Sequence, residues 1–120
     1  MGDGLSQWRD EVTVFLAEVR RNYGLAAEVR LLRDLKKLAE KRHQLRDICK
    51  PLDDGLFELI TSHNKMEYRC IYSFHHPEIV VLLCFVKKSR KTPPKYLAEA
   101  RKRNGHVERK EVPLGDVTLH

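Results

Sequence analysis

The spacing of apolar residues in the first fifty positions predicts two helices. Over residues 5–19 apolar side chains recur at steps of three and four, which is the pattern of one helix face packed on a core, with Ser6 at the N-cap position. Gly24 ends this stripe, and a second one covers residues 25–48. Pro51 cannot continue a helix. We therefore expect an antiparallel helical hairpin.

After Pro51 the pattern changes to that of strands. Three runs, at 56–60, 68–74 and 79–86, are separated by the turn-forming segments SHNK and HHPE. The third run is apolar throughout, which is typical of a strand covered on both faces. These runs predict three short antiparallel strands.

The C-terminal third predicts one more helix. Thr92 caps it, one of the two prolines that follow opens it, and residues 95–104 form it until Gly105 ends it. Residues 106–120 are expected to be a loose tail, or to add an edge strand around 107–112. The fold class is therefore α/β (α+β): an N-terminal helical hairpin packed on a small antiparallel sheet of three to four strands, followed by a C-terminal helix.

The length and the distribution of charge limit the functional class. A chain of 120 residues is the size of one domain, which we place at 1–120. Residues 87–110 hold ten of the 23 basic residues but two of the 17 acidic ones, so the net charge of +6 is regional. A local excess of this kind favours an anionic partner, first of all nucleic acid. No apolar run is long enough to span a membrane and the start lacks a signal pattern, so we expect a cytoplasmic protein without a membrane partner.

The three cysteines do not predict a metal site. Cys49, Cys70 and Cys84 form no CxxC pair and have no His at zinc-ligand spacing, so neither a metal nor a cofactor is expected. Cys70 and Cys84 fall in apolar runs and are predicted to be buried reduced thiols.

The basic residues are expected to meet at one end of the sheet. If HHPE is the turn, facing residues sum to 153, which places Arg69 opposite Cys84 and Lys87 opposite Met66 to within one register step. Arg is seldom buried without an acidic partner, and two alternatives stay open for Arg69: a ligand-facing role, or a salt bridge to Glu58 on the neighbouring strand. The cluster itself has a simpler alternative, a solvated basic edge that discourages strand pairing.

Four motifs in order carry a family resemblance. After the helical hairpin, "KPLDDGLFELI", "EYRCIYSF", "IVVLLCFVKKSRKTPP" and "YLAEARKR" resemble the HigB-like, phage-derived branch of the RelE/ParE toxin superfamily, over about residues 10–104. The resemblance implies a RelE-like fold and the toxin of a type II toxin–antitoxin system. Such a toxin cleaves messenger RNA on the ribosome, which inhibits translation, and is silenced by a cognate helix-turn-helix antitoxin protein.

The motifs carry over onto Arg69, Lys87, Lys88 and Lys91. The chain departs from the family pattern at Ile60, where Arg is common, and at Leu83-Cys84, where His-Gly is frequent. The first strand typical of the superfamily is not apparent, because residues 5–19 are predicted to be helical.

RNA cleavage by the 2′-hydroxyl needs a proton acceptor, cations around the phosphorus and a proton for the leaving oxygen, without a metal. Arg69 suits the phosphate, and Lys87 or Lys91, crowded by like charges, suits proton exchange with help from Tyr96. His63 is a second-tier candidate, whereas His75 and His76 belong to the far end of the sheet. The catalytic set is therefore Arg69, Lys87, Lys91 and Tyr96, and the RNA-binding set is Lys88, Arg90, Lys95, Arg101 and Arg103.

Two other functional classes remain open from the sequence. One is a non-catalytic nucleic-acid or protein binding module with a toxin-like fold. The other is a ParE-like inhibitor of gyrase. Cleaved transcripts would exclude the first, and blocked supercoiling beside intact RNA would favour the second.

Overall fold

The computed structural model describes residues 4–41, 45, 47–87 and 91–119, which form six strands and three helices. In chain order the elements are β1 (Leu5–Trp8), α1 (Glu11–Tyr23), α2 (Leu25–Lys41), β2 (Cys49–Pro51), β3 (Leu56–His63), β4 (Met66–His75), β5 (Glu78–Lys87), α3 (Pro94–Glu108) and β6 (Leu114–Asp116). The mixed α+β class and the helical hairpin are confirmed.

The strands form one sheet in the order β2-β3-β4-β5-β1-β6. Neighbouring strands are antiparallel except β1 and β5, which run parallel. The expected sheet of three to four strands is therefore too small. The additional strands have three or four residues each, too few for a period-2 pattern to stand out in the sequence.

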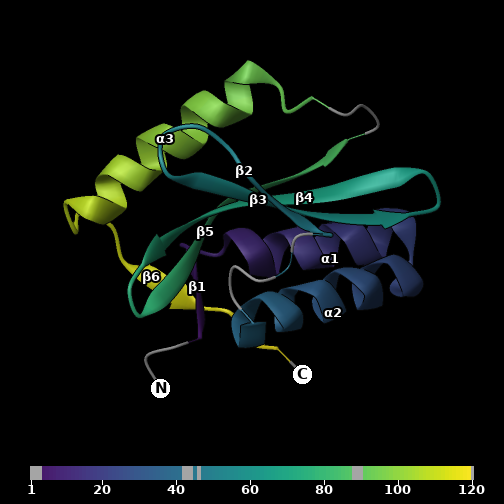
Figure 1. Ribbon diagram of the computed structural model, residues 1–120. Helices are drawn as coiled ribbons and strands as arrows, with labels where there is room; N and C mark the ends of the chain where they lie inside the picture. The colour runs from purple at the N-terminus through teal and green to yellow at the C-terminus, as the bar shows by residue number, and fades with distance from the viewer. Residues whose placement is uncertain (1–3, 42–44, 46, 88–90, 120) are drawn as a thin grey trace.

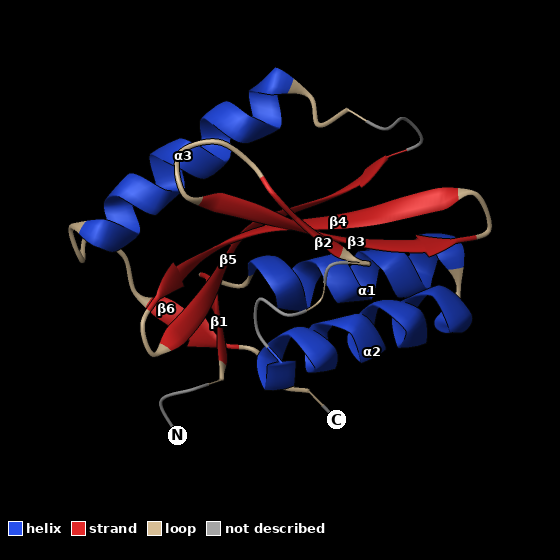
Figure 2. Ribbon diagram, viewed as in Figure 1, coloured by secondary structure: helices blue, strands red, loops and turns tan. Residues whose placement is uncertain are grey.

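The molecule has three layers (Figures 1 and 2). α1 and α2 lie side by side on one face of the sheet, and α3 crosses the other face. Each face has its own apolar cluster: Leu31, Leu35 and Leu38 of α2 pack on the first, and Ala100 and Val107 of α3 pack on the second.

β5 is the central strand, as its apolar run predicts. It lies between β4 and β1, and its residues from Ile79 to Phe85 are buried. Near the β4–β5 turn facing residues sum to 153, as expected, but a bulge shifts the register so that Arg69 faces Phe85 and Glu67 faces Lys87. Leu82 and Leu83 both join the cluster under α3, which follows from the extra residue in this strand.

The start of the chain is a strand, and the helix expected over 5–19 is wrong there. β1 pairs with β5, and Ser6 is not an N-cap, because its hydroxyl donates to the Glu78 carboxylate. The start of α1 is instead capped by the buried Gln7, whose Oε1 accepts from the backbone N–H groups of Val12 and Thr13 at 2.8 and 3.0 Å. A strand side chain thus replaces the usual capping residue.

Two helix boundaries also differ from expectation. α2 ends at Lys41 rather than near residue 48, and the chain enters the edge strand β2, where the missing N–H of Pro51 is tolerated. α3 passes through Gly105 and ends at Glu108, because Val107 packs into the core; Pro93, not Thr92, precedes it at the N-cap. The expected strand around 107–112 is wrong, and β6 forms an edge strand at 114–116 instead.

Candidate functional site

A buried arginine lies at the end of the sheet where the sequence places the site. Arg69 on β4 is 1% exposed, and two carboxylates hold its guanidinium. Its Nη1 donates to Glu58 Oε1 at 3.3 Å, and its Nε donates to Glu67 Oε1 at 3.1 Å, with Nη2 on the same oxygen. The salt bridge to Glu58, one of the two alternatives drawn from the sequence, is confirmed.

Glu58 joins this arginine to the segment that precedes α3. The Thr92 hydroxyl donates to the two Glu58 oxygens at 2.9 and 3.1 Å and accepts from Arg69 Nη1 at 3.3 Å. The Lys50 ammonium on β2 lies 3.5 Å from Glu58 Oε1. These contacts tie β2, β3, β4 and the start of the last helix together. We call Lys50, Glu58, Glu67, Arg69 and Thr92 the Arg69 network.

The sequence does not indicate three members of this network. Thr92 is predicted to cap a helix, and no role is predicted for Glu67 or Lys50. A detectable signal was the alternation of β4, which puts Glu67 and Arg69 on the same face two residues apart. Thr92 lies outside the strands, so the pattern of the sheet does not predict its contacts with Glu58 and Arg69. They follow from where the start of α3 lies relative to the sheet.

An aromatic stack fixes the start of α3 beside the network. The rings of Phe85 and Tyr96 lie 4.1 Å apart at an interplanar angle of 13°, and Phe85 faces Arg69 across the β4–β5 pair. The Lys95 ammonium lies 5.0 Å from the centre of the Tyr96 ring. This stack therefore holds the first turn of the helix over the Arg69 network.

Three lysines lie at the same end of the sheet as this buried centre. Lys87 is half-buried at the end of β5 and faces Glu67, while Lys91 and Lys95 are exposed on either side of Thr92. The structure thus brings Arg69, Lys87, Lys91, Lys95 and Tyr96 to one end of the sheet. Lys88 and Arg90, both predicted to bind RNA, lie outside the described residues. We call Lys87, Lys91 and Lys95 the lysine rim.

The arginines of α3 do not belong to this rim. Arg101 pairs with Asp54 of the β2–β3 turn, with Nε 2.5 Å from the carboxylate. Arg103 turns inward and donates to Glu99 at 2.9 Å, to Glu11 at 2.9 Å and to the Leu82 carbonyl at 2.8 Å. Its guanidinium thus donates a hydrogen bond to a backbone oxygen of β5, at a residue just past the part of β5 that pairs with β1. Arg103 therefore has a structural place that the sequence did not indicate.

The match to a protein family covers the site. A family model described as phage derived protein Gp49-like (DUF891) matches residues 22–104, which include the Arg69 network and the lysine rim. The chain belongs to this family. It is a toxin–antitoxin-associated, RelE/HigB-like family, in agreement with the motifs from "DGLFEL" onward. A comparison with curated proteins gives no match.

His63 and His75 of this Gp49-like protein lie at opposite ends of the sheet. His63 is half-buried at the end of β3, beside the turn to β4, three residues after Ile60, which pairs with Arg69. His75 lies at the opposite end of the sheet, as expected. Its Nε2 contacts Ser73 Oγ at 3.0 Å and Asn104 Oδ1 at 2.8 Å, which makes it part of the packing between β4 and α3.

Two of the departures from the family pattern, Leu83 and Cys84, fall on buried positions, while Ile60 is half-buried. Cys84 and Cys70 face each other with their sulfurs 3.4 Å apart, and both are buried free thiols, as predicted. Burial, the Cys70 contact and the nearby Glu11 charge raise the pKa of the Cys84 thiol well above its ordinary value. At this position the Gp49-like protein thus has a protonated, inaccessible group at neutral pH.

Two features are absent from the described residues of the Gp49-like protein. No helix among them is long and apolar enough to cross a membrane. No group of three or more His, Cys, Asp or Glu residues within the described ranges lies close enough to hold a metal ion.

Proposed function

We propose that this Gp49-like protein is the toxin of a toxin–antitoxin pair and cleaves messenger RNA at the lysine rim. The observation that carries the proposal is the convergence of Lys87, Lys91, Lys95 and Tyr96 around a buried arginine at one end of the sheet. Membership of a toxin–antitoxin-associated family supports it. A cationic rim on a rigid sheet end suits an RNA backbone, because phosphate contacts dominate the affinity for nucleic acids.

The proposed reaction is attack by the ribose 2′-oxygen on the adjacent phosphorus. The P–O5′ bond breaks as the new P–O2′ bond forms, which leaves a 2′,3′-cyclic phosphate and a 5′-hydroxyl. One group takes the proton of the 2′-hydroxyl, and another gives a proton to the departing 5′-oxygen. Lys87 and Lys91 are the proposed groups for these transfers, Tyr96 positions the substrate, and Lys95 binds a flanking phosphate.

Arg69 has two parts in this proposal. Its contact with Thr92 positions the lysine rim, and its charge offsets the build-up of negative charge on the phosphate. Direct contact with a phosphate requires Glu67 to turn away from Nε and Nη2. Glu67 is the partner able to do so, because its side chain is 28% exposed whereas that of Glu58 is fully buried.

Expression of the chain tests the proposal. The wild type should arrest growth, and transcripts in a translating extract should be cut with 5′-hydroxyl ends. Lys91→Ala and Lys87→Ala should each relieve the arrest, whereas Lys36→Ala, an exposed lysine of α2, should not. Since these lysines lie outside the core, loss of folding does not confuse the result. If both rim variants stay fully toxic, the proposed site is wrong.

A second candidate function is RNA binding without cleavage. The two carboxylates that bind Arg69 favour this candidate. They neutralise the positive charge of the guanidinium, which would otherwise stabilise a reacting phosphate. This candidate predicts that RNA affinity falls steeply with salt while transcripts stay intact. Mapping of transcript ends in the translating extract separates the two functions.

A further inference from the structure

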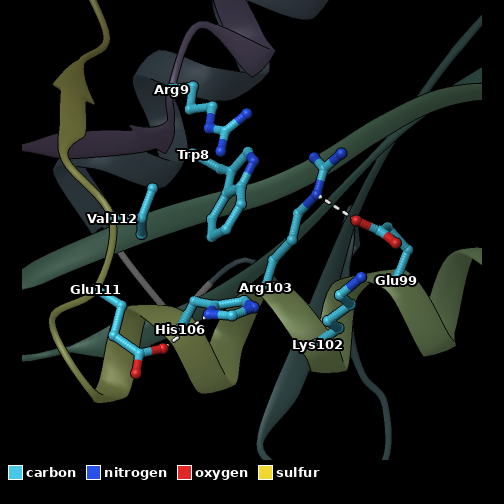
Figure 3. A pocket seen from close by; sticks show the side chains of 8 residues that line it. All are labelled: Trp8, Arg9, Glu99, Lys102, Arg103, His106, Glu111 and Val112. Carbon is cyan, nitrogen blue, oxygen red and sulfur yellow. Dashed lines mark hydrogen bonds and ion pairs between the residues drawn. The ribbon is translucent and has the colours of Figure 1, made fainter.

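A cleft of about 320 Å³ opens at the other end of α3 (Figure 3). Trp8 and Arg9 enter it from the end of β1, while Glu99, Lys102, Arg103 and His106 enter it from α3. Glu111 and Val112, from the segment after α3, close the third side. The cleft is thus built from two regions that are far apart in the chain, residues 8–9 and residues 99–112.

One wall of the cleft is held in place by buried contacts. Trp8 is 9% exposed, and the Arg103 guanidinium lies 5.3 Å from the centre of its ring. Arg103 is itself held by Glu99 and Glu11. On the floor, His106 Nδ1 lies 2.8 Å from Glu111 Oε1. These groups have partners and provide a preformed surface rather than free charge.

Arg9 is fixed by its backbone as well as by its side chain. Its φ of 53° lies in the left-handed region, which L-residues seldom adopt. Gly115 of β6 allows this close approach, because a Cβ there would lie 2.7 Å from the Arg9 carbonyl oxygen. The guanidinium lies 5.4 Å from the Trp8 ring centre while the residue stays exposed. An exposed cation is therefore held at the mouth of the cleft.

Two cations at this mouth have no acidic partner within the described part of the chain. No ion pair forms there to Arg9 or Lys102, although Glu99 and Glu111 line the same cleft. Lys102 follows Lys95 of the lysine rim by seven residues, close to two helical turns, so both lie on one side of α3 about 10 Å apart along the axis. Glu99 lies between them on this side of the helix, and its carboxylate is paired with Arg103, which compensates its charge.

We propose that this cleft is a second RNA-binding subsite, which holds the strand a few nucleotides away from the bond at the lysine rim. Arg9 and Lys102 contact backbone phosphates there, while Trp8 and Arg103 keep the wall rigid. The inference rests on the proposed function, because the same RNA strand must occupy both sites. The proposed ligand is single-stranded RNA that is long enough to occupy the lysine rim and the cleft at the same time.

Binding of 2′-O-methyl oligouridines tests this subsite, since these probes lack the attacking hydroxyl. Fluorescence anisotropy should use probes of about four and about twelve nucleotides. The Arg9→Gln/Lys102→Gln double variant should bind the longer probe about tenfold more weakly. Loss of two phosphate contacts should also reduce the slope of log affinity against log salt by about 1.4. Its affinity for the short probe should be unchanged.

Two controls separate charge from folding. Arg21→Gln/Lys36→Gln removes the same charge from exposed positions of α1 and α2 and should leave both probes unaffected. Arg9→Lys/Lys102→Arg keeps the charge and should bind the longer probe as the wild type does. Retention of wild-type affinity for the longer probe by the Gln double variant overturns the subsite alone. Failure of the wild type to bind either probe overturns RNA recognition at both sites, and failure to cleave transcripts tests the proposed function separately.

Discussion

The two faces of the sheet hold their helices by different means. Under α1 and α2 the contact is mainly apolar, with Leu31, Leu35 and Leu38 fully buried, and a buried hydrogen bond joins Thr61 to Asp34 at 2.6 Å. The α3 face instead buries charge at Arg69 and Glu58, and Arg103 reaches Glu11 across the sheet. The helical hairpin is therefore positioned mainly by apolar burial, whereas the last helix has ionic contacts in addition to its apolar cluster.

This difference explains why the candidate site lies on the α3 face. Apolar packing tolerates small shifts of a helix, whereas a buried guanidinium satisfied by several oxygens requires one geometry. Buried ion pairs add little net stability compared with apolar residues. Their presence under α3 is accounted for by the need to hold the lysine rim in one place over the sheet.

Replacement of Glu58 by Ala should give the largest loss. Arg69 would stay buried without its inner carboxylate, and removal of one partner of a buried pair costs about 3–5 kcal/mol. Urea unfolding followed by circular dichroism measures this. Growth arrest should be lost as well, because Thr92 would lose its acceptor. Glu58→Gln keeps the shape and should lose less, and a Glu58→Ala variant as stable as the wild type would contradict a buried pair.

Replacement of Leu35 by Ala tests the apolar face by the same measurement. The fully buried side chain leaves a cavity, for which about 3 kcal/mol is a typical loss. Growth arrest per folded molecule should be unchanged, since Leu35 packs in the apolar cluster on the face of the sheet opposite α3. Equal loss of activity in folded Leu35→Ala and Glu58→Ala protein would remove the distinction between the two faces.

The elements with a long, one-sided pattern were predictable from the sequence. The apolar run of β5 predicted a central strand, and the stripe of α2 predicted its packing face. Leu5 and Trp8 led to the wrong prediction of a helix, because their spacing of three residues fits one. In β1 all four residues are instead buried, so no one-sided pattern marks the strand. Gly105 misled because packing of Val107 outweighs the cost of about 1 kcal/mol for glycine inside a helix.

The part of the candidate site that was predictable from the sequence is the part that strand pairing brings together. Antiparallel β4 and β5 had to bring Arg69 and Lys87 to one end, and Glu58 was an evident partner on β3. The bulge at Leu82 leaves no signal in the composition, so the sequence predicts the register at the site only to within the one step by which it differs. The contact of Thr92 and the inward turn of Arg103 depend on how α3 crosses the sheet, which no local pattern records.

The change of stability with pH in the alkaline range tests the apolar face at a single buried residue, Cys84. Burial raises the pKa of the Cys84 thiol well above its ordinary value of 9.0, so the folded protein keeps a proton that the unfolded chain releases. The free energy of unfolding should therefore fall as pH rises above about 9, by up to about 1.4 kcal/mol per pH unit for this group. Burial also raises the pKa of Cys49, Tyr68 and Tyr72, which acts in the same direction.

Cys84→Ala isolates the contribution of this thiol. Unfolding free energies measured at about pH 8 and about pH 10 should show a smaller decrease in the variant than in the wild type. The difference between the two pH values is the readout, so the packing loss caused by the smaller side chain cancels. Equal decreases in the two proteins would show that Cys84 titrates normally in the folded state.

The exposed pair between Arg101 and Asp54 should give the smallest effect. Both side chains are largely in solvent, 42% and 64% exposed, where ion pairs contribute about 0.2–1 kcal/mol and are weakened by salt. Arg101→Ala should lower the unfolding free energy by no more than this, and a double-mutant cycle with Asp54→Asn should give a coupling energy that disappears in high salt. Asn suits position 54, where φ is 62°. A coupling energy as large as the loss in Glu58→Ala would mean that α3 is held by surface charge, and not by the buried network beneath it.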